Sequence, residues 1–215
     1  MNQIREIAVA PQEVHKDRAK RRQIMDGART VFREKGFDAA SMGEITRQAG
    51  VSKGTLYVYF ESKEELFEAI FEEESRAQAE QVFALDHSDR NVEAVLTRLG
   101  CDFVRYLCDP VRLSSHRTVV SIAERMPALG RRFYAAGPAT GVARVQNYLE
   151  AQVAAGVLHI EDCELAAAQF LDTCPSTMFK PMMFASAPPP SPERINHVVA
   201  VAVRTFLAAY ARPSV

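Results

Sequence analysis

The segment SKGTLYVYF, residues 52–60, combines residue types that contact nucleic acid. Lys53 supplies a cation that can pair with a phosphate, and Lys63 lies a few residues further along the chain. Gly54 lets a backbone approach a phosphate or a base edge closely. As isolated residues, the two lysines would equally suit a solvated surface, but in this surrounding they indicate phosphate contacts.

Four aromatic or hydroxyl-bearing residues follow Gly54, namely Thr55, Tyr57, Tyr59 and Phe60, and the first three also suit contacts to nucleic acid. Thr55 and Tyr57 are expected to point outward, whereas Leu56 and Phe60, four residues apart, share a helix face and are expected to face a core. The rings therefore divide: Phe60 is expected in the packing, and Tyr57 and Tyr59 are expected at the DNA.

The elements that would position these residues are two short helices joined by a tight turn. Ser41 with Glu44 three residues later predicts a capped helix start, and Ser52 predicts the start of the next helix. Between them the sequence AGV, residues 49–51, supplies the small residue and the glycine that let two helices cross closely. The pattern is that of a helix-turn-helix, whose second helix enters the major groove of DNA.

Two longer helices are expected on either side of this motif. The first starts near Arg18 and ends at Gly36, and the second starts at a further capping box formed by Ser62 and Glu65. The run KDRAKRR, residues 16–22, suits either a solvated helix start or additional contacts to a DNA backbone. The apolar residues of these helices recur at helical spacing and predict a small core: Ile24, Ala28, Val31, Phe32, Leu66, Phe67, Ile70 and Phe71.

The segment MGEITRQAGVSKGTLYVYFESKEELF resembles the DNA-binding segment of the TetR family of bacterial transcriptional regulators, over roughly residues 18–70. The resemblance implies an all-helical homodimer in which three N-terminal helices bind DNA and a fourth links them to a body that binds a small effector and the partner subunit. It implies DNA contacts at eight positions: Ser41, Thr46, Lys53, Gly54, Thr55, Tyr57, Tyr59 and Lys63. Gly43 departs from the family pattern, because some members carry a base-reading side chain there. The region AERMPALGRRFYAAGP also resembles the C-terminal domain of one common TetR subgroup.

The charge distribution supports a polyanionic partner for the N-terminal part. The chain has 215 residues and a net charge of -1, but residues 1–60 carry 11 Lys and Arg against 7 Asp and Glu, and the remainder carries 15 against 20. A basic N-terminal part on an acidic body suits operator DNA. No signal peptide or membrane-spanning run is apparent, and the four cysteines form no CxxC pair, so a reduced cytoplasmic protein is expected, with no metal and no cofactor.

The rest of the chain is expected to be helical as well. Helices are predicted at residues 91–108, 110–126, 162–178 and 191–211. A short helix is predicted to start at residue 127, and after a break at AAGPATG, residues 135–141, another is predicted to end at residue 156. No segment alternates convincingly as a strand. The sequence thus predicts an all-α fold with a flexible tail at residues 1–17, a DNA-binding domain at 18–61, and an effector-binding and dimerisation domain at 62–215.

The last predicted helix is apolar on most of its circumference, so it is expected to be buried on two sides. One side would face its own core and the other a second subunit, which suits a two-fold dimer on a palindromic operator. The residues predicted at this interface are Ile195, Val199, Ala202, Phe206 and Tyr210.

Small-molecule pockets in helical bodies are mostly apolar with a few polar groups. Ten residues of those types are candidates for lining one, although aromatic and Met residues at helical spacing belong to a core more often than to a pocket: Phe103, Arg105, Tyr106, His116, Phe133, Tyr134, Tyr148, Phe170, Met178 and Phe179. Their character favours an uncharged, lipophilic effector.

Two other classes of function compete with the hypothesis of a ligand-responsive repressor. The sequence carries no phosphate-binding glycine loop, nucleophile elbow or zinc-spaced histidine pair, so nothing in it favours an enzyme. An architectural DNA-binding protein or an activator without an effector remains an alternative, which the aromatic body disfavours.

Overall fold

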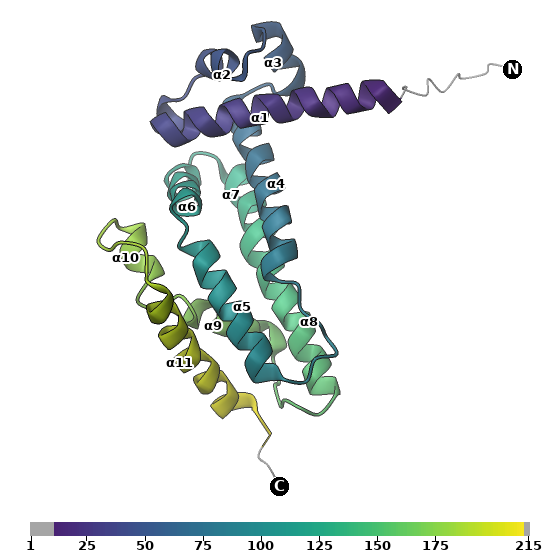
Figure 1. Cartoon of the computed structure of the whole chain (residues 1–215), viewed down its shortest axis with the longest axis vertical. Helices are drawn as coiled ribbons and strands as arrows, with labels where there is room; N and C mark the ends of the chain where they lie inside the picture. The colour runs from purple at the N-terminus through teal and green to yellow at the C-terminus, as the bar shows by residue number, and fades with distance from the viewer. Residues whose placement is uncertain (1–10, 213–215) are drawn as a thin grey trace, which may run out of the picture. The chain divides into compact units, whose positions relative to one another are not determined.

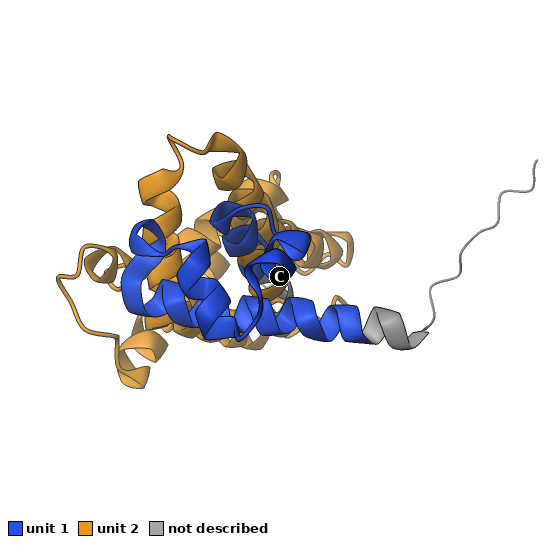
Figure 2. Cartoon of the chain, turned by 90° about the horizontal axis from the view of Figure 1, so that it is seen from above, with its two compact units in different colours: residues 1–70 blue, residues 71–215 orange. Residues whose placement is uncertain are grey.

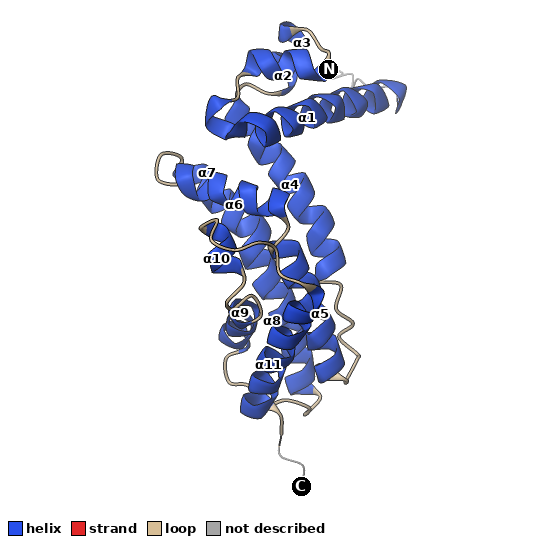
Figure 3. Cartoon of the chain, turned by 60° about the vertical axis from the view of Figure 1, so that its left-hand side comes forward, coloured by secondary structure: helices blue, strands red, loops and turns tan. Residues whose placement is uncertain are grey.

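The computed structural model describes residues 11–212, except for the side chains of residues 11–15 and 75–79. The regular elements of this range are all helices (Figures 1 and 3), which confirms the all-α prediction. They are α1 (Pro11–Ala39), α2 (Met42–Ala49), α3 (Lys53–Tyr59), α4 (Lys63–Val82), α5 (Val92–Leu107), α6 (Pro110–Ile122), α7 (Pro127–Tyr134), the π-helix η1 (Ala135–Ala139), α8 (Thr140–Ala154), α9 (Cys163–Thr173), α10 (Phe179–Met183) and α11 (Pro192–Tyr210). In the described part of the chain, none of these helices combines the length and the apolar character needed to cross a membrane.

The chain divides into two compact units, coloured separately in Figure 2. We call residues up to Ile70 the head and residues from Phe71 onward the body. The division falls inside α4, which is one continuous helix, so the first eight residues of α4 pack with the head. The predicted domain boundary at residue 61 lies at the start of this helix.

Helix α1 begins at Pro11, so residues 11–17 are helical where a tail is predicted, and residues 1–10 lie outside the described range. Near the other end, Gly36 has φ 77° and ψ 168°, which interrupts the helical backbone. Residues with a Cβ rarely adopt a positive φ, so glycine suits this position. The predicted helix end at Gly36 therefore coincides with a break, and a further turn reaches Ala39.

The ends of α2 and α3 are fixed by local hydrogen bonds. The Ser41 hydroxyl accepts from the Glu44 amide at 3.3 Å while the Glu44 carboxylate accepts from the Ser41 amide at 3.1 Å, so the predicted capping box is confirmed. The Ser52 hydroxyl caps α3 by accepting from the Thr55 amide at 3.0 Å. Helices this short are not stable alone, and they pack on a core made of Ile24, Met25, Ala28, Val31, Ala40, Ile45, Leu56, Phe60, Leu66 and Ile70.

The crossing of α1 and α2 depends on a close backbone approach. A Cβ on Gly27 would lie 2.7 Å from the Cα of Ala49, so only glycine fits there. Beside it, the side-chain amide of Gln23 donates to the carbonyl of Ala49 at 2.6 Å. The two contacts fix how α2, and hence the turn into α3, sits against α1.

The start of α4 is capped somewhat differently from the prediction. The Ser62 hydroxyl accepts from the Glu65 amide at 3.1 Å, as expected for a capping box. The carboxylate of Glu65 reaches one residue further back and accepts from the Glu61 amide at 2.7 Å. The cap therefore holds the short connection between α3 and α4 as well as the helix end.

The body is built around α5, α8, α9 and α11, whose apolar residues form its core. A loop before α5 is attached to α8 by polar side chains. Tyr148 is fully buried and donates to the carbonyl of Asp89 at 3.1 Å, and Arg90 donates to the side-chain oxygen of the buried Gln152 at 2.9 Å. Burial raises the pKa of Tyr148 to about 12, so the phenol stays protonated.

The cysteines of the body are small core residues, as predicted. Cys101, Cys108 and Cys174 are buried free thiols, and Cys163 is half-buried. Burial raises the pKa of Cys174 to about 12, which keeps it in the unreactive thiol form.

The α11 residues predicted at a subunit interface are largely covered within the single chain. Val199 is 0% and Phe206 is 5% exposed in the single chain, because both pack on α5 and α9. Ile195 and Ala202 are buried with them, and Tyr210 is half-buried against the same core. Four of these side chains keep at most 5% of their surface, so a partner that met α11 would contact mainly its exposed face, and the interface residues stay a prediction.

The structure contradicts the predicted break at residues 135–141. The chain stays helical through Pro138 by widening into η1, which joins α7 to α8. Proline removes one backbone donor and crowds the preceding turn, and a wider π turn accommodates both effects. The Thr140 hydroxyl donates to the carbonyl of Ala135 at 2.8 Å within this segment.

Candidate nucleic-acid interface

One face of α3 is open to solvent and carries four residues. They are Lys53, Gly54, Tyr57 and Val58, with Tyr57 44% and Val58 80% exposed. At about 100° per residue these positions span an arc of roughly 140°, and Leu56 on the opposite side is buried in the head core. The face offers a cation, a phenol and an apolar group, a combination suited to the major groove of DNA.

Lys53 and Tyr57 lie next to each other on this face. The ammonium nitrogen of Lys53 is 5.9 Å from the centroid of the Tyr57 ring, near the outer limit of a cation–π contact. The pair therefore presents a charge and a hydroxyl together, as needed to hold a phosphate and a neighbouring sugar or base.

Thr55 is less outward-facing than predicted. It is half-buried, and its hydroxyl lies 2.8 Å from the hydroxyl of Ser52, the N-cap of the same helix. This hydroxyl is therefore engaged within the chain. A DNA contact by Thr55 remains a prediction that rests on its methyl group or on a turned hydroxyl.

Tyr59 has an internal partner rather than a free hydroxyl. Its hydroxyl donates to Asp17 on α1 at 2.7 Å, and its ring packs against the head core. This hydrogen bond raises the pKa of the Tyr59 phenol. The residue ties the end of α3 to α1 in the free chain, and its DNA contact stays a prediction.

Lys63 is engaged within the head in the free chain, and its phosphate contact stays a prediction. Its ammonium donates to the carbonyls of Phe37, Asp38 and Ala40 at 2.9, 3.0 and 3.2 Å, and it lies 4.7 Å from the Phe37 ring centroid. An ammonium has three N–H donors, so all of them have acceptors in the chain. Lys63 satisfies carbonyls at the end of α1 instead of standing ready for a phosphate.

Helix α2 offers fewer contacts than the family pattern. Ser41 is exposed but serves as the cap, and the hydroxyl of Thr46 donates to the carbonyl of Met42 at 2.7 Å. Gly43 is exposed, and a Cβ there would meet nothing within 4 Å. Arg47, four residues later, is exposed on the same side of α2. It is the neighbour able to replace the contact that Gly43 lacks, and the sequence analysis did not single it out.

An open groove of about 750 Å³ lies along α1 and the end of α2. Two of its residues, Arg18 and Arg22, belong to the basic run predicted either as solvated or as a backbone contact. The groove also holds a carboxylate, Asp26, which pairs with Arg29 at 2.6 Å. The full lining is Arg18, Ala19, Arg22, Gln23, Asp26, Gly27, Thr30, Gln48 and Ala49.

In the body, three of the ten predicted effector residues come together with a fourth ring. We call Phe71, His116, Phe133 and Phe179 the aromatic cluster. Phe71 of α4 stacks on Phe133 of α7 with ring centroids 3.8 Å apart, and His116 meets the edges of Phe133 and Phe179 at 5.1 and 6.0 Å. The cluster joins α4, α6, α7 and α10.

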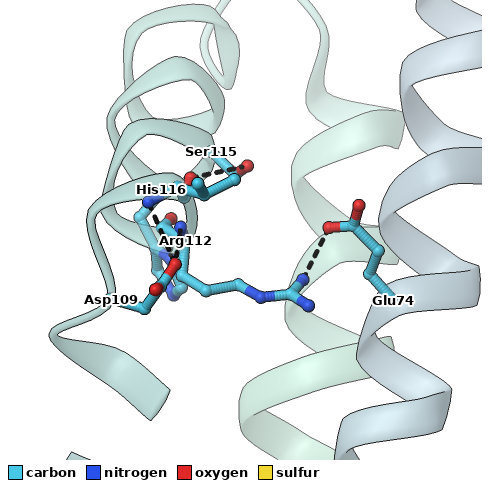
Figure 4. A network of polar contacts seen from close by, with 6 residues as sticks. Glu74, Asp109, Arg112, Ser115 and His116 are labelled. Carbon is cyan, nitrogen blue, oxygen red and sulfur yellow. Dashed lines mark hydrogen bonds and ion pairs between the residues drawn. The ribbon is translucent and has the colours of Figure 1, made fainter. Parts of the chain in front are cut away.

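Figure 4 shows a polar network that includes His116 of the aromatic cluster. Arg112 of α6 forms an ion pair with Glu74 of α4 at 2.6 Å, with 16% and 22% of the two side chains exposed. Asp109 caps α6 by accepting from the Arg112 amide at 3.1 Å, and the ring nitrogen Nδ1 of His116 lies 2.9 Å from the Arg112 carbonyl. Burial lowers the pKa of His116 below its ordinary value and the nearby Arg112 cation adds to this, while the hydrogen bond with the Arg112 carbonyl acts in the opposite direction.

The other seven predicted effector residues have contacts outside these four rings, and their role in effector binding stays a prediction. Tyr148, Phe170 and Met178 are core residues of the body. Phe103 is half-buried beside Phe83, Arg105 pairs with Asp102 at 2.8 Å, Tyr106 lies under the Arg112 guanidinium, and Tyr134 is exposed.

Besides Arg47, sequence reasoning missed Val58, Arg112 and Glu74 at these sites. Val58 follows Gly54 by four positions, so helical geometry alone would have placed it on the open face of α3. Arg112 precedes His116 by four positions and could have been found in the same way. Glu74 carried no such signal, because its partner is 38 positions away in the sequence.

Two family models match the chain. The one described as "Bacterial regulatory proteins, tetR family" matches residues 24–70, and the one described as "AefR-like transcriptional repressor, C-terminal domain" matches residues 94–212. The second match alone covers more than half of the chain.

Individual relatives agree with the two models. An uncharacterized HTH-type transcriptional regulator YfiR of Bacillus subtilis is 41% identical over 58 residues, which are 27% of this chain and 28% of that protein. Matches to the first curated relatives span between 20% and 41% of their lengths. A putative TetR-family transcriptional regulator from Mesorhizobium loti has a TM-score of 0.84 and 28% identity, covering 90% of this chain and 98% of its own. The Flavonoid-responsive Regulator FrrA has a TM-score of 0.76 and 29% identity, covering 91% and 99%.

Proposed function

The chain belongs to the TetR family of bacterial transcriptional regulators, and on that premise we propose that it is a repressor that binds a palindromic operator as a homodimer. The family are regulators and not enzymes. We further propose that a small, mostly apolar effector binds the body and releases the operator. Chromosomal DNA as the target implies a cytoplasmic protein.

The observation that carries the DNA-binding proposal is the open face of α3. A capped two-turn helix presents Lys53 and Tyr57 with no intervening side chain at Gly54. Arg47 on α2 adds a second cation. We assign phosphate contacts to Lys53 and Arg47 and a sugar or base contact to Tyr57. Ser41, Thr46, Gly54 and Thr55 remain proposed contacts at closer approach.

The dimer must use faces that the single chain leaves open. Val201 on α11 is 40% exposed and Leu165 on α9 is 52% exposed, while the opposite sides of both helices are buried. Two copies related by a two-fold axis would pair these faces, since an isologous interface repeats the same patch. Val201→Arg combined with Leu165→Arg should give a folded monomer by sedimentation. A dimer of unchanged stability would place the interface elsewhere.

The aromatic cluster is the proposed effector region. Rings that stack and meet edge to face favour a planar, lipophilic ligand that can replace one of them. The likeness to a flavonoid-responsive regulator supports an aromatic effector of this kind. The half-buried His116 and the Arg112–Glu74 pair supply the polar groups that such a site needs for orientation.

Two contacts attach α4 to the rest of the body at this cluster, the Phe71–Phe133 stack and the Glu74–Arg112 pair. Helix α4 continues from these residues into the head. An effector that displaces either contact would allow α4 to move, and movement of α4 in a dimer would change the spacing of the two reading helices. Operator half-sites lie about 34 Å apart, so a change of a few ångströms would misplace one head.

The test begins with duplexes selected from a random pool by the full-length protein. A palindrome should emerge, and the log of its binding constant should fall with log salt at a slope of about -5 to -9 for roughly 6–10 phosphate contacts. Flavonoid-like aromatic compounds are then titrated with and without the operator. The effector should weaken operator binding, and the operator should weaken effector binding by the same free energy, typically about 1–3 kcal/mol. Equal affinities in both titrations would support the alternative, an activator or architectural protein without an effector.

A further inference from the structure

Val58 is the more exposed of the two large hydrophobic side chains on the open face of α3, and the proposed function gives it no role. It is 80% exposed and lies one turn beyond Gly54, on the same stripe of the helix. Tyr57 borders it on one side, and the half-buried Tyr59 follows it. The only other residue on this stripe of α3 has no side chain, so Val58 is the group that protrudes.

We propose that Val58 reads the 5-methyl group of a thymine in the operator half-site. The inference rests on the proposed function, in which the open face of α3 lies in the major groove. Each base pair displays hydrogen-bond donors and acceptors there, and thymine alone adds a methyl group. A valine side chain has neither donor nor acceptor, so against any other base feature it would leave a polar atom without a partner.

The geometry of α3 brings Val58 within reach of the bases. The helix has seven residues, and Val58 is about 7.5 Å along the axis from Lys53 at 1.5 Å per residue. The major groove is about 12 Å wide, so both turns of so short a helix fit inside it. A Cβ at Gly54 would meet nothing nearer than the Ser52 hydroxyl at 3.9 Å. Because residue 54 has only a hydrogen, no side chain beside Val58 obstructs a close approach of the helix to the bases.

The side chain is also prepared for such a contact. Valine in a helix strongly prefers one χ1 rotamer, so its methyl groups lose little freedom when a base packs against them. The same branching makes valine a poorer helix former than alanine. An exposed position in a two-turn helix therefore gains nothing in the free chain from a valine.

The competing explanation is an ordinary solvated valine, since single exposed apolar residues are common on proteins. The two explanations differ in a measurable way. A solvated valine should be indifferent to the methyl group of any base. A methyl-reading valine should lose affinity when one particular methyl group is removed and nothing else changes.

The experiment uses the full-length protein and a duplex that it selects from a random pool. Each thymine of one half-site is replaced singly by deoxyuridine, which lacks only the methyl group, and dissociation constants are measured at fixed salt. One position should weaken binding about fourfold, the equivalent of one buried methyl group. Replacing its counterpart in the other half-site as well should weaken binding about fifteenfold.

The variant Val58→Ala should remove this sensitivity at that position and leave all other positions unchanged. Its thermal unfolding should match that of the wild type, because the side chain is exposed and alanine favours the helix. Val120→Ala is the matched control, since Val120 is also exposed but lies on α6 of the body. It should keep the full deoxyuridine profile of the wild type.

A second arm separates methyl reading from shape. Placing 5-methylcytosine opposite guanine at the sensitive position should bind the wild type better than cytosine does, and Val58→Ala should not distinguish the two. Duplex binding with no deoxyuridine-sensitive position, or with the same sensitivity in Val58→Ala, would overturn the inference while leaving operator binding intact. Failure to select any duplex would instead overturn the operator proposal together with it.

Discussion

The reading helices of the head and the polar contacts of the body differ in how far apart their hydrogen-bonding partners lie along the chain. In the head, caps form between residues three apart, as in the Ser41–Glu44 and Ser52–Thr55 pairs. In the body, the Arg112–Glu74 pair joins residues 38 positions apart, and the Arg90–Gln152 contact spans 62. The difference teaches that the ends of the two reading helices are fixed by local sequence. Their attachment to α1, through Tyr59–Asp17 and Lys63–Phe37, and the effector region both depend on partners that local sequence does not connect.

The largest expected effect tests whether α11 belongs to the core. Phe206→Ala should lower the free energy of unfolding by about 3–5 kcal/mol, since it removes a buried ring that packs edge to face on Phe170. Thermal and urea unfolding at several protein concentrations measure it. The control Val120→Ala, at an exposed position on α6, should stay within about 0.5 kcal/mol.

A reversed outcome would break the comparison at this point. If Phe206→Ala weakened self-association while each subunit kept its stability, the ring would belong to an interface after all. The dependence on protein concentration separates the two cases, because a core defect lowers stability at every concentration.

The next effect is expected in the head, at the crossing of α1 and α2. Gly27→Ala places a methyl group 2.7 Å from a backbone atom of Ala49, which cannot move aside as a side chain could. A loss of about 1–3 kcal/mol is expected, with faster hydrogen exchange of α2 amides and weaker operator binding. Gly43→Ala is the control, because its Cβ would enter open space and alanine favours a helix by about 0.5–1 kcal/mol. Equal effects of both variants would mean that the crossing is not tightly fixed.

A smaller effect separates the two lysines of the head. Lys63→Met should cost about 1–2 kcal/mol of stability, since it leaves three carbonyls at the end of α1 without their charged donor, and the salt dependence of operator binding should stay the same. Lys53→Met should leave stability unchanged and flatten the salt slope by about one unit in each half-site. Stability is read by urea unfolding and the slope by titrations at several salt concentrations. A flattened slope in Lys63→Met would restore that residue as a phosphate contact.

The same contrast explains what the sequence could and could not predict. Capping residues, the turn glycine and the apolar stripes are local signals, and they placed α2, α3 and the buried side of α4 correctly. The internal acceptors of Lys63 were not predicted, because they lie 23 to 26 positions earlier in the sequence and no local pattern indicates such a contact. In α11, an apolar circumference predicted burial but could not say which side the chain itself covers. Phe206 and Val201 differ only in what α5 and α9 place against them.

The smallest expected effect concerns pH and the aromatic cluster. Burial lowers the pKa of His116 in the folded protein, whereas an unfolded histidine titrates near 6.5. Above that value the imidazole is neutral in both states, and pH has no effect through this group. Below it the unfolded chain takes up the proton more readily, so the stability that neutral His116 allows is lost as pH falls toward the folded pKa. Over one pH unit this loss cannot exceed about 1.4 kcal/mol.

The measurement compares the wild type with His116→Gln, which stays uncharged throughout this range. The rings of Phe133 and Phe179 and the Arg112 cation face His116, and none of them offers a counter-charge to an imidazolium. We define the gap as the unfolding free energy of the wild type minus that of the variant. It should therefore decrease from pH 7.5 to pH 5.5. Carboxylates elsewhere titrate in both proteins and cancel in the difference. A gap that widens at low pH would show that the folded body stabilises the protonated ring, and the cluster would then have to be read as a polar site suited to an anionic ligand.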